Sequence, residues 1–313
     1  MRKKKPYYDK PGVSNSSLAW LLPESGGSPA AYSYFLNNPP PELDSPEVTL
    51  GSLIHAFCED PAGTSTIVIS ALPGPGVVKT IKYLLAQEET PLDKFDKEQI
   101  YQAAKAVNYG QSWKPDTVVR KVLEEGFEYA SALLRENDHL YIVDPEQDKV
   151  FKILADRLRD EVWFSHTSTF FETPTHVERE KEIYFELEGV QCKALIDRLV
   201  TMNGPKQILV EDIKTTHMPI SWFEGYNDGI TEEVGQMFKR QVHRQLAFYD
   251  HAVRKSLGKE AFDWRIDHII VAIQTTPPYE IKRIYVDPSL IEIGRKRIDQ
   301  ALAAIKLYDK ELI

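Results

Sequence analysis

Three residues near the middle of the chain have types and spacing that could hydrolyse a phosphodiester. Asp197 lies in one run of strand-forming residues, and Asp212 and Lys214 lie in the next. The turn-forming residues Asn203-Gly204-Pro205 separate the two runs, so we expect two strands that lie side by side. Alternation along the second strand then directs Asp212 and Lys214 to one face, and residues 211 and 213 to the other.

If this register is right, Asp197 meets Asp212 near the end of the sheet. Two adjacent carboxylates repel each other, which raises the pKa of one of them unless a cation relieves the repulsion. A divalent metal ion is the usual relief, and the Lys214 ammonium could hold a nucleophilic water or offset charge on a phosphate. The pattern is typical of metal-dependent phosphodiesterases. A simpler interpretation is that Asp-x-Lys occurs here by chance and that Asp197 and Arg198 form a surface ion pair.

Four segments, in this order, give the chain a resemblance to a known family: Gly51-Ser-Leu-Ile-His55, Lys193-Ala-Leu-Ile-Asp197-Arg198, Asp212-Ile-Lys214-Thr-Thr216 and Gln245-Leu-Ala-Phe-Tyr249. Through them the chain, from Ser14 to about Pro288, resembles the PD-(D/E)XK nuclease superfamily. The similarity is to the phage and prophage exonucleases that include exonuclease VIII (RecE-type), and more distantly to lambda exonuclease and RecB-type nuclease domains. Each segment is weak singly, and the specific signal is the order of all four.

The resemblance implies a Mg²⁺ site, in which we expect Mn²⁺ to substitute. Its ligands would be His55, Asp197, Asp212 and the backbone carbonyl of Ile213, and the catalytic residues would be Asp197, Asp212 and Lys214. The residues assigned to DNA binding or positioning are Gln245, Tyr249, Arg244 and Thr215. Without the resemblance, a core histidine at position 55 and local hydrogen bonds of Gln245 and Tyr249 would be the simpler explanation.

The activity implied by the resemblance is degradation of one strand of linear double-stranded DNA, 5′ to 3′. The product would carry a 3′ single-stranded tail for a single-strand annealing recombinase. A ring-shaped homo-oligomer, a trimer or tetramer, would explain processivity. Two alternatives remain open: a structure-specific or restriction-type endonuclease on the same core, and a DNA-binding subunit without activity.

Composition sets limits on the class of protein. The 313 residues are 42% hydrophobic and 27% charged, which is ordinary for a globular protein with a sizeable core. Two cysteines, Cys58 and Cys192, exclude a four-cysteine cluster formed by this chain alone. The net charge of -9 argues against a protein that coats DNA, but not against an enzyme with a basic cleft. With no apolar run that could span a bilayer and no secretory signal, we expect a cytoplasmic protein without a membrane partner, in a bacterial host if phage-encoded.

We expect an α/β fold with the restriction-endonuclease-like core of the PD-(D/E)XK superfamily: a mixed central sheet flanked by helices, with a helical insertion. A single domain, 1–313, would comprise N-terminal core helices (1–60), the mostly helical insertion (61–160) and the catalytic sheet and helices (161–313). Alternation and apolar runs predict strands at 66–72, 176–188, 191–201, 207–214, 267–274 and 279–286. Helical periodicity predicts helices at 77–87, 96–107, 116–137, 144–160, 232–257 and 288–312.

Overall fold

The computed structural model of the chain divides into two compact units. Unit 1 comprises Met1–Lys3 and Leu43–Ala155, and unit 2 comprises Lys4–Glu42 and Asp156–Ile313. The residues that the structure describes are Tyr7, 10–22, 26–38, 46–135, 140–160, 176–202, Gly204, 206–221 and 241–311.

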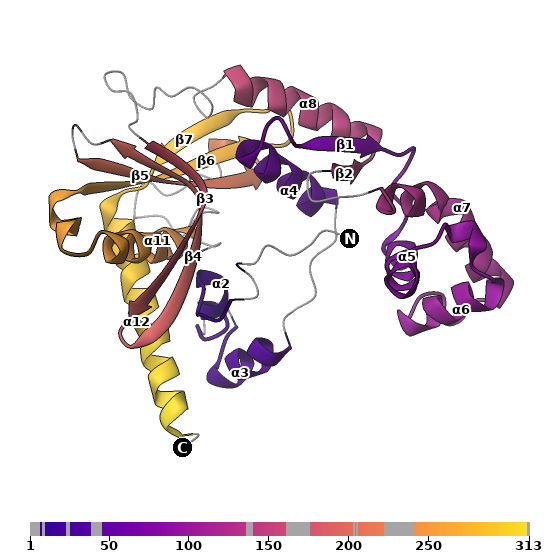
Figure 1. The fold of residues 1–313 in the computed structure, drawn as a ribbon, viewed down its shortest axis with the longest axis horizontal. Helices are drawn as coiled ribbons and strands as arrows, with labels where there is room; N and C mark the ends of the chain where they lie inside the picture. The colour runs from indigo at the N-terminus through magenta and orange to yellow at the C-terminus, as the bar shows by residue number, and fades with distance from the viewer. Residues whose placement is uncertain are drawn as a thin grey trace. The chain divides into compact units, whose positions relative to one another are not determined.

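Unit 2 is built on a five-stranded mixed sheet with the strand order β3-β4-β5-β6-β7 (Figure 1). The first three strands form an antiparallel meander, β6 runs parallel to β5, and β7 runs antiparallel to β6. The connection from β5 to β6 contains the helix α11, as the crossover between parallel strands requires. The bounds are β3 (His176–Leu187), β4 (Val190–Met202), β5 (Gln207–Thr216), α11 (Val242–Leu257), β6 (Arg265–Gln274) and β7 (Ile281–Tyr285).

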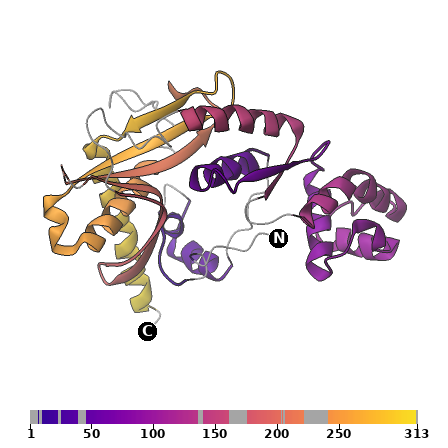
Figure 2. The ribbon, with the colours of Figure 1, turned by 45° about the horizontal axis from the view of Figure 1, so that its top comes forward.

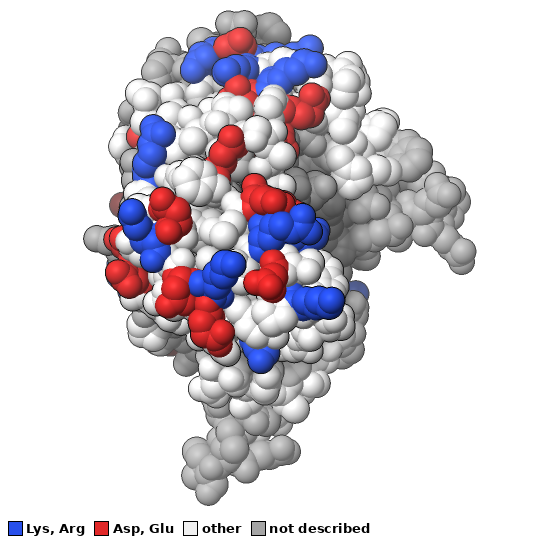
Figure 3. All heavy atoms as spheres, turned by 90° about the vertical axis from the view of Figure 1, so that its right-hand side faces the viewer, with Lys and Arg blue, Asp and Glu red and all other residues white. Residues whose placement is uncertain are grey.

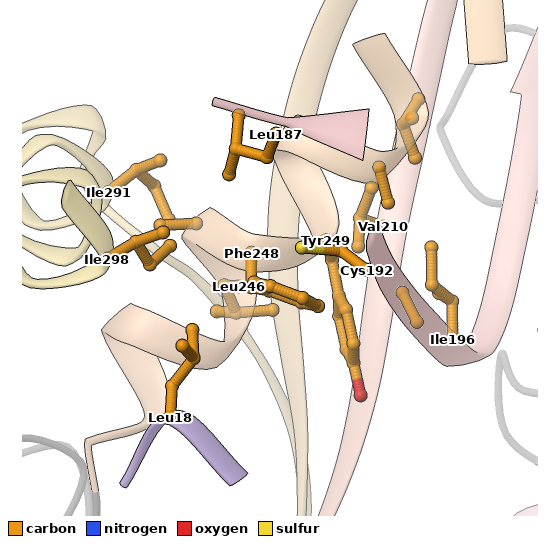
Figure 4. Packing of buried hydrophobic residues seen from close by; sticks show 14 of the residues in the cluster. Leu18, Leu187, Cys192, Ile196, Val210, Leu246, Phe248, Tyr249, Ile291 and Ile298 are labelled. Atoms are coloured by element: carbon orange, nitrogen blue, oxygen red, sulfur yellow. The ribbon is translucent and has the colours of Figure 1, made fainter. Parts of the chain in front are cut away.

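Helix α11 packs against β3, β4 and β5, and α12 (Pro288–Glu311) packs against α11. Figure 4 shows Leu246 and Phe248 of α11 among the apolar side chains of the sheet and of α12. The two helices approach closely at Gly294, where a Cβ atom would lie only 2.4 Å from the carbonyl oxygen of His243. The short helices α2 (Asn15–Leu18) and α3 (Pro29–Asn37) complete this core.

Buried charges on the opposite face of the sheet join three strands. Glu211 of β5 is fully buried, and its two carboxylate oxygens accept hydrogen bonds from Arg198 of β4 and Arg283 of β7. Arg198 is directly opposite Glu211 in the β4–β5 register, so the pair confirms which face Glu211 occupies. Arg198 is therefore paired with Glu211 in the interior of the sheet, whereas the simpler interpretation of the sequence placed it at the surface.

A second buried carboxylate, Asp250, holds α11 in place. Its Oδ2 accepts hydrogen bonds from Arg254 at 2.9 Å and from Arg295 of α12 at 2.7 Å, and His268 of β6 lies 3.4 Å from its Oδ1. Burial raises the pKa of Asp250, but the bonds and charges of His268, Arg295 and Arg254 outweigh burial and lower it overall. The helix that faces the sheet is thus tied by charge to its neighbours on both sides.

Unit 1 contains a two-stranded parallel sheet and a set of helices. Helices α5, α6 and α7 pack together around a core of their own (Figure 2). Helix α8 begins in unit 1 and ends in unit 2. The bounds are α4 (Pro46–Glu59), β1 (Ser65–Val68), α5 (Pro75–Gln87), η2 (Leu92–Lys94), α6 (Lys97–Ala106), α7 (Pro115–Leu133), β2 (Leu140–Val143) and α8 (Pro145–Asp160), and in unit 2 η3 (Gly258–Asp263).

Positive and negative side chains are interspersed on the face drawn in Figure 3. Two ion pairs follow the surface of α7: Arg120 with Glu124 at 4.0 Å and Lys121 with Glu125 at 3.1 Å. Exposed pairs of this kind stabilise a helix by only a few tenths of a kcal/mol, roughly 0.3–0.5. They describe a solvated helix surface.

The predicted α/β fold with a mixed sheet flanked by helices is confirmed. All the predicted strands are present within a few residues, but β2 was not predicted because four apolar residues beside a helix start show no period. The start of the helix predicted at 232–257 lies outside the described residues, and α11 begins at Val242. Helix α4, which carries His55 and was predicted to belong to the core helices of 1–60, is part of unit 1. No described helix is long and apolar enough to cross a membrane.

Candidate active site

The candidate site forms where β4 parts from β5. The two strands pair from Met202 and Gln207 as far as Arg198 and Glu211, so Asp197 and Asp212 directly follow the last pair of the ladder, where the strands separate. There the Ile213 N–H donates a 2.7 Å hydrogen bond to Oδ2 of Asp197. The side-chain carboxylate thus accepts a bond that a backbone carbonyl of β4 would accept in a continuing ladder. The end of the hairpin thus places the Asp197 carboxylate at the backbone of the residue that follows Asp212.

Asp212 and Lys214 project from the same face of β5. The Lys214 ammonium lies 2.5 Å from Oδ2 of Asp212. Asp212 is fully buried, whereas the side chain of Lys214 is 21% exposed, so the amine lies at the boundary between the carboxylate and solvent. An ammonium in that position is available both to the carboxylate and to a group that enters from outside.

Helix α11 contributes two more polar groups to this face. The Gln245 side-chain amide donates to Oδ1 of Asp212 at 2.9 Å and to the Tyr249 hydroxyl oxygen at 2.7 Å. Burial raises the pKa of Tyr249 well above its usual value, and the nearby charges of Asp212 and Asp197 raise it further. Figure 4 shows the Tyr249 ring beside Cys192 and Ile196 of β4, with its hydroxyl pointing away from Ile291 and Ile298. One phenol therefore lies within electrostatic reach of both carboxylates.

The donor atoms fit a hard divalent cation. Asp197 and Asp212 supply carboxylate oxygens, and the N–H and C=O of a strand residue point to the same side, so the Ile213 carbonyl also faces β4. Carboxylate and carbonyl oxygens are the ligands that Mg²⁺ takes in proteins. Within the described ranges no group of three or more His, Cys, Asp or Glu side chains could hold a metal, so a site here would draw on the backbone as well.

Three more residues were predicted to belong to the site. Arg244 is buried, and its Nε donates to the side-chain oxygen of Asn15 at 3.0 Å, which ties α11 to α2. Side chains alternate between the two faces of a strand, so Thr215 lies on the face of β5 opposite to Asp212 and Lys214. His55 is half-buried on α4 in unit 1, while the carboxylates belong to unit 2. The roles of these three residues in binding DNA or metal stay predictions.

Two residues near the site were given no role by the sequence. Lys193 is part of a motif that carries the resemblance, and Tyr7 lies in the basic N-terminal stretch. The Tyr7 hydroxyl donates to the Lys193 carbonyl at 3.1 Å, which places Tyr7 at the strand that carries Asp197. The sequence feature that could have pointed to Lys193 is its position four residues before Asp197 in the same motif.

We expect Gln245→Leu to lower catalytic turnover on DNA by about 10- to 100-fold, the range for losing a partner that orients a metal ligand. The leucine keeps the volume but removes both hydrogen bonds, so Asp212 loses its orientation. Initial rates of nucleotide release would measure the change. Gln102→Leu is the matched control, because that glutamine makes an exposed bond to Glu98 on α6; equal rates for the two variants would contradict a role for Gln245.

Comparisons with known proteins identify the family and the fold. The family described as "PDDEXK-like domain of unknown function" matches residues 147–311, just over half of the chain and nearly all of the sheet unit's strands and long helices. No curated protein matches the sequence. A crystal structure described as a "Putative exonuclease" from Eubacterium rectale shares the fold, with a TM-score of 0.52, 12% identity, and coverage of 99% of this chain and 88% of that one.

A second solved structure, SSO0001, has 12% identity and a TM-score of 0.21 over 81% of this chain and 85% of its own, too low to support an argument. The family match, the five-stranded mixed sheet and the Asp197, Asp212 and Lys214 arrangement point the same way. The chain belongs to the PDDEXK-like family and has the fold of the PD-(D/E)XK nuclease superfamily.

Proposed function

We propose that the protein is a Mg²⁺-dependent exodeoxyribonuclease that degrades one strand of linear double-stranded DNA, 5′ to 3′. The observation that carries the proposal is the placement of Asp212 beside Lys214 at the point where Asp197 bonds the Ile213 backbone. Family membership supports a nuclease, and the description of the Eubacterium rectale protein supports an exonuclease.

The residues of the chain have separable tasks in this reaction. When bound by the oxygens of Asp197, Asp212 and Ile213, Mg²⁺ would polarise the phosphoryl group and favour an activated nucleophile. Lys214 orients the attacking water and offsets the negative charge that develops on the phosphate. Gln245 holds the Asp212 carboxylate by donating to Oδ1, which leaves Oδ2 directed towards Lys214.

The surroundings of the site favour an electrostatic role for its groups. Asp212 is fully buried, and charges interact more strongly where water is excluded. Tyr249 keeps its proton because burial raises its pKa well above neutrality, so it can position a substrate oxygen but is no base.

The resemblance supports the biological setting that we propose with the activity. The 3′ single-stranded tail left by 5′ to 3′ digestion would be the substrate of a single-strand annealing recombinase. A homo-oligomeric ring, trimeric or tetrameric, would keep the enzyme on one DNA end through many cycles.

The test compares linear and covalently closed duplex DNA, each incubated with Mg²⁺, with Mn²⁺ and with EDTA. We expect mononucleotide release from linear DNA with either metal ion, none with EDTA, and intact closed circles throughout. Linear DNA labelled at its 5′ or its 3′ ends reports the polarity, because 5′ to 3′ digestion releases the 5′ label first. Cutting of closed circles would instead identify an endonuclease, and binding without cutting would identify a DNA-binding subunit.

A further inference from the structure

The N-terminal segment is docked beside the candidate site in a way that the nuclease chemistry does not require. Val13 pairs in parallel with Cys192 of β4: the Val13 N–H donates to the Gln191 carbonyl at 2.9 Å, and the Lys193 N–H donates to the Val13 carbonyl at 2.8 Å. This pairing occurs on the part of β4 that has already left β5. The segment therefore satisfies backbone groups that the parting of the strands exposes. We call Tyr7 together with Lys10–Val13 the N-terminal strap.

A buried lysine holds the strap. The Lys193 ammonium donates to the backbone carbonyls of Tyr7 at 2.9 Å and of Lys10 at 2.5 Å, and lies 4.8 Å from the centre of the Tyr7 ring. The Tyr7 hydroxyl in turn donates to the Lys193 carbonyl at 3.1 Å. Lys193 is only 8% exposed, and an ammonium is buried at high cost unless such groups replace its water. The strap supplies those groups, so lysine and strap stabilise each other.

The outer surface of this junction combines an aromatic ring with a positive charge. Tyr184 of β3 is the register partner of Lys193, so both side chains lie on one face, and Tyr184 is 43% exposed. The Lys10 ammonium lies 4.7 Å from the centre of the Tyr184 ring and 3.2 Å from Glu182. An exposed ring beside a lysine is the combination that binds single nucleic-acid strands, by base stacking and phosphate contact.

The strap packs against the part of the structure that holds the candidate active site. Val13 of the strap pairs with Cys192, and Val13, Cys192 and Tyr249 belong to one buried cluster. Tyr249 in turn bonds the same glutamine that holds Asp212. The centres of the Tyr7 and Tyr184 rings are 6.3 Å apart, so the exposed ring of Tyr184 lies next to a buried ring of the strap.

We propose that the N-terminal strap forms a wall of the substrate site, along which one DNA strand approaches Asp197 and Asp212, and that Lys193 is the positioning residue that holds this wall. The strand stacks a base on Tyr184 and places a phosphate near Lys10. This inference deepens the proposed function and rests on it for the identity of the substrate.

The test uses the full chain as wild type, Lys193→Met and Tyr184→Ala, with Lys181→Met as the control. Lys181 lies on β3, is partly exposed and pairs with Glu178, so its loss removes the same charge from the same sheet. Hydrogen exchange of the peptide that contains Val13 reports docking of the strap. Fluorescence anisotropy with a labelled single-stranded oligonucleotide in EDTA reports binding without turnover.

We expect Lys193→Met to accelerate exchange at Val13 and to weaken oligonucleotide binding by about tenfold, and Tyr184→Ala to weaken binding by about tenfold without faster exchange, as the loss of one stacked base would. Lys181→Met should change neither. Faster exchange with unchanged affinity in Lys193→Met would show that the strap is no part of the substrate site, and unchanged exchange would show that Lys193 does not hold it. If the wild type bound the oligonucleotide but cut no DNA with Mg²⁺, the nuclease proposal alone would fail.

Discussion

Replacing Asp212 with asparagine is expected to lower the rate of nucleotide release from linear DNA by at least about a thousandfold. Loss of one well-placed polar group in an active site already costs on the order of 100- to 1,000-fold, and Asp212 would both bind the metal ion and pair with Lys214. The asparagine oxygen can still accept from Gln245, so the side chain stays in place while its charge is lost. Nucleotide release at saturating Mg²⁺ would be measured alongside thermal unfolding.

The fold should survive this substitution, because Asn has the shape of Asp and the neighbouring strands do not depend on its charge. Asp267→Asn is the matched control: Asp267 lies on the adjacent strand β6 and bonds Gln207 and Arg265 near the other end of the sheet. That variant should retain activity. If Asp212→Asn digested DNA at the wild-type rate, the assignment of the active site to this end of the hairpin would be wrong.

Replacing Glu211 with glutamine should produce the largest loss of stability, about 3–5 kcal/mol in the free energy of unfolding. Glu211 is fully buried between Arg198, which is 2% exposed, and Arg283, which is 18% exposed. Without its charge, two guanidinium groups would face each other in the interior with no counter-charge from position 211. Urea denaturation followed by circular dichroism would show the loss as a lower midpoint.

Glu186→Gln provides the comparison, since that glutamate lies on β3 at the surface and accepts an exposed hydrogen bond from the side-chain amide of Gln191. The free energy of unfolding of this variant should differ from that of the wild type by less than about 0.5 kcal/mol, as for most surface substitutions. A Glu211→Gln midpoint equal to that of Glu186→Gln would mean that the buried cluster does not hold the strands together. The same result would remove the reason for the fixed register of Asp197 and Asp212.

The register of the hairpin was accessible to sequence reasoning because several local signals agree. Strand alternation, the turn at residues 203–205 and the position of Asp197 together predicted two paired strands with Asp197 and Asp212 near their separating ends. The structure pairs the strands as far as Arg198 and Glu211, and Asp197 bonds the Ile213 N–H just beyond. Alternation also placed Glu211 and Asp212 on opposite faces correctly. Four residues of β2, in contrast, are too few to show a period, and their pairing with β1 joins segments about 75 residues apart.

What the sequence by itself determined about this protein is its fold class, because four short motifs in a fixed order and the strand and helix patterns along the chain all indicate it. The sequence also predicted the two carboxylates and the lysine of the candidate site, because two short strands joined by a turn bring them near one another. Only the tertiary structure decided which partners those residues have. Arg198 pairs with Glu211 in the interior, Arg244 bonds Asn15, and Lys193 holds a segment more than 180 positions away. The physical reason is that hydrogen bonds and ion pairs depend on distances between atoms, and contacts between remote segments leave no period or spacing in the sequence to read.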